Sequence, residues 1–282
     1  MIMRLRQPLS ALLLAVLLPA SGCTSLTDEE HQWLTDRVRQ QLVFVEGGTF
    51  RMGDVGTTDA EGYVSYFTGD SDTHPVHEVT LDSFSIQKYE TTYAEFDLYS
   101  KAMGEKPLKP DYRNEVYMQP EYPAWWMTWY QARGYCQWLG SLLDLPMDLP
   151  TEAQWEYAAR SRGLAVAHAT DNGDIEYGRN YRDPTQIWHP MPPGSWPPNP
   201  LGLYDMTGNV SEWVLDWYAP YTPDPKTNPT GPAEGYKKVW RGSGVIGGKG
   251  QIQLYRRGHV PPTNTGGGHG VRCVVNHPEP VN

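Results

Sequence analysis

Glycine and proline interrupt this chain too often for a helical bundle. The 282 residues include 28 glycines and 25 prolines. Because proline ends a helix and glycine weakens one, this density predicts a loop-rich fold with short strands and few helices. The 11 tryptophans and 18 tyrosines supply the apolar surface for a large core, which excludes an intrinsically disordered chain.

The charge and the cysteine count exclude further classes of protein. The formal net charge is -10, and no run of lysine and arginine stands against it. Nucleic acid phosphates require clustered basic side chains, so we expect no nucleic acid partner. Three scattered cysteines are too few for a disulfide scaffold and do not have the spacing of a structural zinc site.

The first 22 residues have the pattern of a secretory signal. Arg4 and Arg6 precede an apolar run over residues 9–19, which is shorter than the roughly 20 residues of a spanning helix. The run leads into Ala20-Ser21-Gly22-Cys23, which resembles a bacterial lipobox, although Ala20 stands where leucine is usual. We predict a signal peptide over residues 1–22 and lipidation of Cys23, with an ordinary signal peptide as the alternative. Thr24 follows Cys23 in place of the aspartate of inner-membrane retention, so the predicted location is periplasmic and lipid-anchored to the outer membrane.

The rest of the chain reads as one domain without repeats. Residues 23–41 are a polar tether or a short helix, residues 42–277 the domain, and residues 278–282 a tail. Strands are predicted within two segments, 42–52 (two short strands around a Gly-Gly turn) and 77–89, and helices over 92–103 and 128–143. Thr151 and Gln154 form a capping box that starts a third helix. Helix signals are almost absent after Gly163.

Seven segments in order resemble the formylglycine-generating enzyme, or sulfatase-modifying factor, family. They are FVEGGTFRMG (44–53), HPVHEVTLDSFSIQKYETT (74–92), WYQARGYCQWLG (129–140), LPTEAQWEYAAR (149–160), NPLGLYDMTGNVSEWVLDWY (199–218), RGSG (241–244) and HGVRC (269–273). The resemblance covers essentially the whole chain after the signal. It implies an α+β class, namely the irregular, loop-rich formylglycine-generating-enzyme fold, which is related to C-type lectins.

The same resemblance implies that the family's founding chemistry is absent. Family enzymes oxidise a cysteine of a CxPxR peptide with O2, through two cysteines that hold copper. Aligned on Arg241, these cysteines fall on Gly247 and Ile252, neither of which has a side chain that binds copper. We therefore expect no copper and no formylglycine generation.

Two other family features carry over to this sequence. Cys136 and Cys273 match a structural disulfide of secreted members, with two free buried thiols as the alternative. The Gly-Asn-x-x-Glu-Trp loop implies a structural calcium ion, because carbonyl and carboxylate oxygens suit this ion. The implied ligands are Gly208, Asn209, Val210 and Glu212, although a plain hydrogen-bonded turn is the alternative. A second calcium site would use Asn180 and Tyr181, but Thr185 stands where its aspartate belongs.

Few residues point to another catalytic chemistry. The weak candidates are Tyr255, Arg256 and His259, in the C-terminal segment that borders the family's substrate groove. His269 lies in the same segment, and Trp125 with Trp126 is interpreted as packing.

Two functions agree with these observations. The first is a periplasmic protein that binds an envelope protein partner or regulates it, for example as an accessory of type VI secretion, with the membrane contacted through the lipid anchor. The second is a periplasmic enzyme with different chemistry, such as maturation of a pyoverdine-type siderophore chromophore. Loss of both copper positions with the other motifs retained favours the first.

Overall fold

The structure is a computed structural model, and it describes residues 25–108, 115–183, 185, 189–244 and 249–281. The predicted Cys23 anchor and Gly247 lie outside these residues. Four α-helices are present: α1 (Asp28–Gln41), α2 (Tyr93–Met103), α3 (Trp129–Leu143) and α4 (Glu152–Ala159). Three short 3-10 helices are η1 (Ser71–Thr73), η2 (Glu115–Met118) and η3 (Lys249–Gln251). None of the helices in the described ranges is long and apolar enough to cross a membrane.

Each α-helix begins with the same capping arrangement. The caps are Thr27, Thr92, Thr128 and Thr151, each paired with a Glu or Gln three residues later in a capping box. A capping box satisfies two backbone N–H groups that the first helical turn leaves without partners. The helices predicted at 92–103, 128–143 and from Thr151 are therefore confirmed, each starting one residue after its cap.

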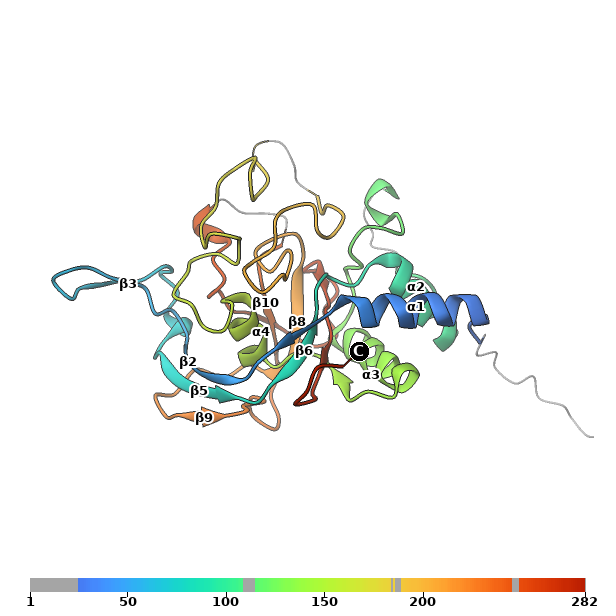
Figure 1. The fold of residues 1–282 in the computed structure, drawn as a ribbon, viewed down its shortest axis with the longest axis horizontal. Coiled ribbons are helices and arrows are strands. Elements are labelled where there is room, and N and C mark those ends of the chain that lie inside the picture. Colours follow the sequence, from blue (N-terminus) through green and yellow to red (C-terminus); the bar gives the residue numbers. More distant parts are fainter. Residues whose placement is uncertain (1–24, 109–114, 184, 186–188, 245–248, 282) are drawn as a thin grey trace, which may run out of the picture.

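The strands form three small sheets and one hairpin. The first sheet has the order β1 (Leu42–Val45), β6 (Phe84–Gln87), β13 (Val274–Val275) and β7 (Met147–Asp148). The second has the order β11 (Gly258–Val260), β10 (Lys238–Arg241), β8 (Ser211–Trp217) and β12 (His269–Gly270). The third has the order β2 (Gly48–Met52), β5 (His77–Leu81) and β9 (Lys226–Thr227). The hairpin of β3 (Thr57–Thr58) and β4 (Val64–Ser65) projects away from the body (Figure 1).

The predicted strands of segments 42–52 and 77–89 exist, but each segment divides between two sheets. β1 pairs with β6, whereas β2 pairs with β5. Neighbouring strands in the sequence therefore form their hydrogen bonds with different partners. Short strands in several small sheets, with four helices, make this an α+β fold with much irregular structure, as predicted.

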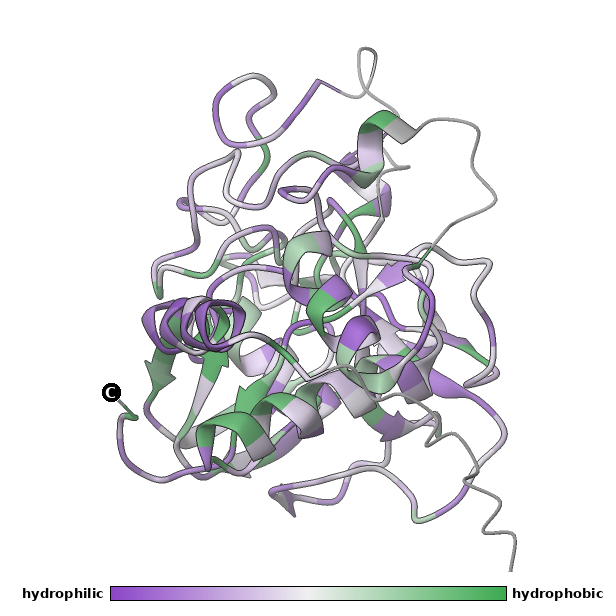
Figure 2. Cartoon of the chain, turned by 90° about the vertical axis from the view of Figure 1, so that its right-hand side faces the viewer, coloured by the Kyte–Doolittle hydropathy of each residue, from purple (hydrophilic) through white to green (hydrophobic). Residues whose placement is uncertain are grey.

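Two large apolar clusters form the core. One lies among the helices and includes Trp129 and Trp213; the other lies between α4 and the sheets and includes Phe84 and Trp155. In Figure 2 the hydrophobic residues gather on helices and strands of the body, and the long loops are mostly hydrophilic or neutral. Leu34 and Val38 of α1 are fully buried in the first cluster, so residues 28–41 are a packed helix and not a free tether.

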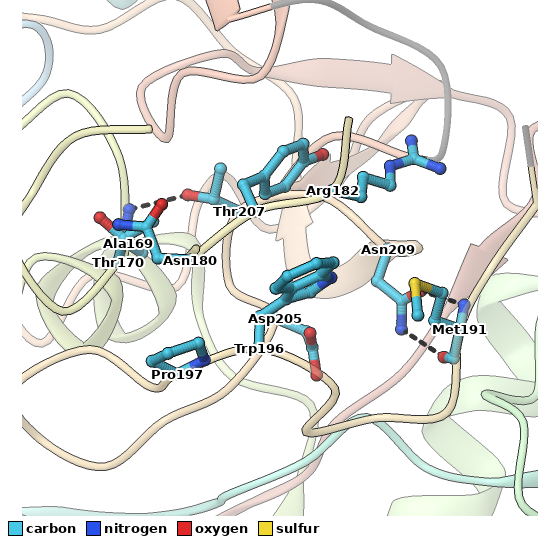
Figure 3. Close-up of a pocket in the computed structure, with 11 residues that line it drawn as sticks. Ala169, Thr170, Asn180, Arg182, Met191, Trp196, Pro197, Asp205, Thr207 and Asn209 are labelled. Atoms are coloured by element: carbon cyan, nitrogen blue, oxygen red, sulfur yellow. Dashed lines mark hydrogen bonds between the residues drawn. The ribbon is translucent and has the colours of Figure 1, made fainter. Parts of the chain in front are cut away.

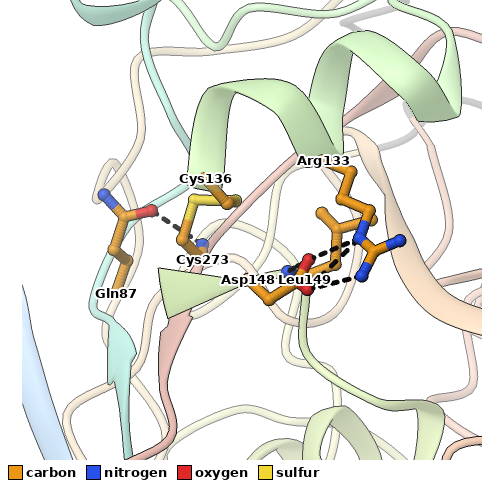
Figure 4. The surroundings of a disulfide bond; sticks show 6 residues. All are labelled: Gln87, Arg133, Cys136, Asp148, Leu149 and Cys273. Atoms are coloured by element: carbon orange, nitrogen blue, oxygen red, sulfur yellow. Dashed lines mark hydrogen bonds and ion pairs between the residues drawn. A yellow bond between two sulfur atoms is a disulfide. The ribbon is translucent and has the colours of Figure 1, made fainter. Parts of the chain in front are cut away.

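The predicted disulfide joins Cys136 of α3 to Cys273, just before β13. Figure 4 shows the bond beside Gln87, whose side-chain oxygen accepts a 2.7 Å hydrogen bond from the Cys273 N–H. Nearby, Arg133 of α3 forms an ion pair with Asp148 of β7 at 2.9 Å. The disulfide and the ion pair attach α3 to the first sheet, and the two-free-thiols alternative is wrong.

Candidate functional site

A small pocket of about 20 Å³ forms where three loop segments meet. Its lining residues come from segments 169–182, 191–197 and 205–209. Figure 3 shows Trp196 and Asp205 in the middle of the view, Asn180 and Pro197 on one side, and Asn209 and Met191 on the other. The pocket therefore combines an aromatic ring, a carboxylate and amide groups around a space about the size of one water molecule.

The two segments predicted as separate calcium sites are neighbours at this pocket. Asn180, Tyr181 and Asn209 line it, and Gly208 packs directly against Tyr181. A Cβ atom at Gly208 would lie 2.2 Å from the Tyr181 hydroxyl, and Gly208 has a φ of +94°, so glycine is required there. Asn180 is held by its own loop: its side-chain oxygen accepts from the Glu176 N–H at 2.8 Å.

Thr185 does not supply the missing aspartate. Its hydroxyl donates to the carboxylate of Asp183 at 2.7 Å.

Glu212, the carboxylate of the predicted calcium loop, forms a fully buried ion pair with Arg272. The Arg272 Nε and Nη2 atoms lie 2.7–2.9 Å from the two Glu212 oxygens. The Trp155 indole N–H donates to the same carboxylate at 2.8 Å. A calcium ion at these oxygens would have to displace a guanidinium group of like charge. As placed, the side chains fit an ion pair better than a calcium ligand set, and calcium binding stays a prediction.

Two further carboxyl groups, which the sequence analysis missed, lie beside this loop. Glu90 is 1% exposed and accepts hydrogen bonds from the Val210 N–H at 3.0 Å and from the Asn209 amide. Burial, and then the nearby charges of Asp205 and Glu212, raise the pKa of Glu90 well above its ordinary value. Burial also raises the pKa of Asp205 to about 6. Asp205 lines the pocket, so it is the group there that can exchange a proton near neutral pH.

Comparison with known proteins identifies the family of this chain. Residues 31–277 match the sulfatase-modifying factor enzyme 1-like domain. The chain belongs to this family.

Curated relatives differ in how much of their length the domain occupies. The "Serine/threonine-protein kinase pkn1" of Chlamydia pneumoniae is 33% identical over 261 residues, which are 84% of this chain but 38% of the relative. The chain thus spans about two fifths of the length of the kinase-named relatives. The formylglycine-generating enzyme of Streptomyces coelicolor is 29% identical, and the match covers 82% of this chain and 88% of that enzyme.

Solved structures confirm the fold. The structure of PvdO from Pseudomonas aeruginosa superimposes with a TM-score of 0.68 at 25% identity, covering 83% of this chain and 93% of PvdO.

The alignment on Arg241 predicts that the second copper position of the family falls on Ile252. Ile252 is fully buried in a small apolar cluster with Ile175 and Tyr181. Within the described ranges, both cysteines are joined in the Cys136–Cys273 disulfide. The described residues of the domain therefore supply no free cysteine thiolate that could bind copper.

The weak catalytic candidates do not converge. Tyr255 is buried and stacks on Phe67, with ring centroids 5.4 Å apart, and burial raises its pKa. Arg256 faces Asp70 at 3.4 Å, and the His259 ring lies 3.8 Å from the ring of Tyr218.

None of these three residues lines the pocket in Figure 3. They form no acid–base pair with one another among the described residues, so the geometry gives this trio no catalytic role.

His269 and the tryptophan pair have structural surroundings. Burial lowers the pKa of His269 to about 3, so its ring is neutral, and its Nδ1 atom lies 2.6 Å from the Ser211 hydroxyl. Trp125 is 8% exposed within the first core cluster, with Trp126 packed against that cluster. The packing interpretation of the tryptophan pair is confirmed.

Proposed function

We propose that this protein is a binding or regulatory protein of the cell envelope and does not generate formylglycine. The observation that carries the proposal is the burial of Ile252, in an apolar cluster, at the second copper position. Without both thiolates the domain lacks the ligands for Cu(I), while its disulfide and core remain intact. A domain that keeps its fold but lacks the copper ligands can still bind another molecule, and we infer that binding is its function.

The projecting hairpin offers a surface for a protein partner. Tyr63, Val64 and Tyr66 are 74%, 45% and 56% exposed, so two aromatic rings and a valine face solvent together on one short segment. Tyrosine is enriched among the residues that dominate protein interfaces. Exposed apolar groups along one strand of a projecting hairpin reduce solubility, and contact with a partner removes this cost.

The kinase-named relatives support a modular role. In them the matching region is 38% of a longer chain, so the domain occurs attached to other segments. We propose that here an anchor at Cys23 holds the domain in the periplasm, at the outer membrane. A type VI secretion accessory role belongs to this proposal.

The hairpin variant Tyr63→Ser/Tyr66→Ser tests the proposal. Cross-linking in intact cells, followed by purification, should give one stoichiometric envelope protein with the wild type and a loss of at least tenfold with the variant. Tyr236→Ser is the matched control, because Tyr236 is 78% exposed and lies far from the hairpin in sequence. No stoichiometric partner, or equal recovery from all three proteins, would sink the binding proposal.

One observation favours a second candidate function. The likeness to PvdO covers 93% of that protein, so a PvdO-like envelope enzyme of siderophore chromophore maturation is the alternative. Asp205 would then be the proton-exchanging group in the pocket of Figure 3. Accumulation of an unfinished small-molecule product in cells that carry Asp205→Asn would favour the enzyme, and an unchanged metabolite profile would count against it.

A further inference from the structure

A second pocket, of about 350 Å³, shares no lining residue with the pocket of Figure 3. Its walls are apolar and aromatic, formed by Met52, Trp217, Pro220, Tyr221, Pro229 and Pro232. Its volume lies in the range of small-molecule sites, and rings and prolines form part of its wall. The polar groups in it decide which molecule it accepts.

Two charged groups of the second pocket, Glu152 and Arg257, are paired with each other. Arg257 donates through Nε and Nη2 to the two oxygens of Glu152 at 2.6 and 2.8 Å, and through Nη1 and Nη2 to backbone carbonyls. Arg241 also donates to Glu152, at 2.9 Å. Although burial raises the pKa of Glu152, the charges of Arg257 and Arg241 lower it to about 2. An anionic ligand therefore finds these guanidinium groups occupied.

Asp216 is the acceptor that this network leaves open. It lines the second pocket and is 5% exposed. Its Oδ2 accepts from the Glu152 N–H at 2.8 Å, and this is the one hydrogen bond that the Asp216 carboxylate receives from the described residues. Gly231 lies against it: a Cβ atom there would be 3.2 Å from Oδ1. A carboxylate oxygen at a pocket wall without a donor from the protein can accept a hydrogen bond from a ligand.

No ion pair joins Asp216 to the cations around it among the described residues. Lys238 donates to the Leu215 carbonyl at 2.8 Å, with its ammonium 3.9 Å from the rings of Trp129 and Trp217. Burial, followed by the charge of Glu152, raises the pKa of Asp216 to about 7, although Arg257 and Lys238 oppose the shift.

Two other titratable groups line the second pocket. They are Lys226, which is half-buried on β9, and His77, whose pKa burial lowers, so that its ring is neutral near pH 7.

We propose that the second pocket binds a primary alkylammonium group, with Asp216 as its counter-ion. The ammonium supplies N–H donors to Oδ1, and the apolar walls beside Trp217 and Tyr221, whose rings already contact Lys238 and Arg257, suit the alkyl chain. A metal ion is not favoured, because no group of three or more His, Cys, Asp or Glu side chains in the described segments is arranged to hold one. The proposal is independent of the partner-binding function, since the hairpin is not part of this pocket.

Calorimetric titration with n-pentylammonium tests this proposal. Saturable binding is expected at pH 7.5, while the matched neutral alcohol, 1-pentanol, and the matched anion, pentanoate, should not bind. A short acetylated and amidated lysine peptide is the second cationic probe. Binding of the peptide alone would assign the site to a lysine side chain of a protein, and binding of pentylammonium would assign it to a free amine.

The variant Asp216→Asn should weaken pentylammonium binding at least tenfold. Asp82→Asn is the matched control, an exposed carboxylate that does not line the second pocket, and it should bind as the wild type does. A second measurement needs no variant: wild-type affinity should rise between pH 5.5 and pH 7.5, as Asp216 ionises. Equal binding of 1-pentanol, full binding by folded Asp216→Asn, or pH-independent affinity would each overturn the proposal.

Discussion

Replacing Glu212 with alanine will destabilise the domain strongly, because it leaves Arg272 as an unpaired charge. The exposed fractions of the two side chains are 1% and 0%. Three contacts of 2.7–2.9 Å join them, and the Trp155 N–H loses its acceptor as well. Removing one partner of a buried ion pair costs about 3–5 kcal/mol, and a buried N–H without an acceptor adds about 1–3 kcal/mol. For a domain of this size, at about 2–4 °C per kcal/mol, such a loss lowers the melting temperature by about 8–32 °C.

Urea unfolding followed by tryptophan fluorescence measures this cost. Glu212→Gln should also be strongly destabilised, since the amide carries no charge. The double variant Glu212→Gln/Arg272→Met should recover stability relative to Glu212→Gln alone, because it removes the buried charge that the single variant strands. A loss below 1 kcal/mol for Glu212→Ala, or no recovery in the double variant, would refute the assignment of Glu212 to the ion pair.

Three further predictions follow from other groups. The calcium assignment requires Ca²⁺ to raise the melting temperature of the wild type but not that of Glu212→Ala; equal responses would remove it. Replacing Cys136 and Cys273 by alanine should cost up to about 5 kcal/mol, since the bond closes a loop with a sequence separation of 137, and unchanged urea midpoints would contradict this. The raised pKa of Asp216, about 7, means that its contribution to stability is complete below pH 4 and is lost as pH rises through 7. Asp216→Asn should therefore gain up to about 4 kcal/mol relative to the wild type between pH 4 and pH 8, and parallel pH profiles would be the contrary result.

Local chemistry made part of this fold predictable. The capping boxes at Thr92, Thr128 and Thr151 involve residues three apart, so a short window of sequence contains the whole signal for a helix start. Sheet membership has no such local signal. β6 pairs with β13, whose residues lie far along the chain, and nothing in residues 84–87 identifies that partner.

In the candidate site, too, residues within a local motif could be predicted from the sequence, whereas residues brought in by distant contacts could not. The loop ending at Glu212 was found from its motif, but Glu90 was missed, because its hydrogen bond to Val210 spans 120 residues. Asp216 is an ordinary aspartate in the sequence, and only burial beside Glu152 gives it a raised pKa. Arg272, the partner of Glu212, lies in the segment HGVRC, but the sequence assigns it no role. An ion pair between residues 60 positions apart cannot be predicted from their spacing.

The central claim, a sulfatase-modifying factor domain without copper oxidation, is tested most directly by an activity assay. Purified protein is incubated with a CxPxR peptide, copper and O2, and the peptide cysteine is followed by mass spectrometry. The Streptomyces coelicolor formylglycine-generating enzyme serves as the positive control. The buried Ile252 and the disulfide-bonded cysteines predict that the peptide stays unmodified while the control converts it. Formylglycine formed by this protein above the level without enzyme would contradict the claim.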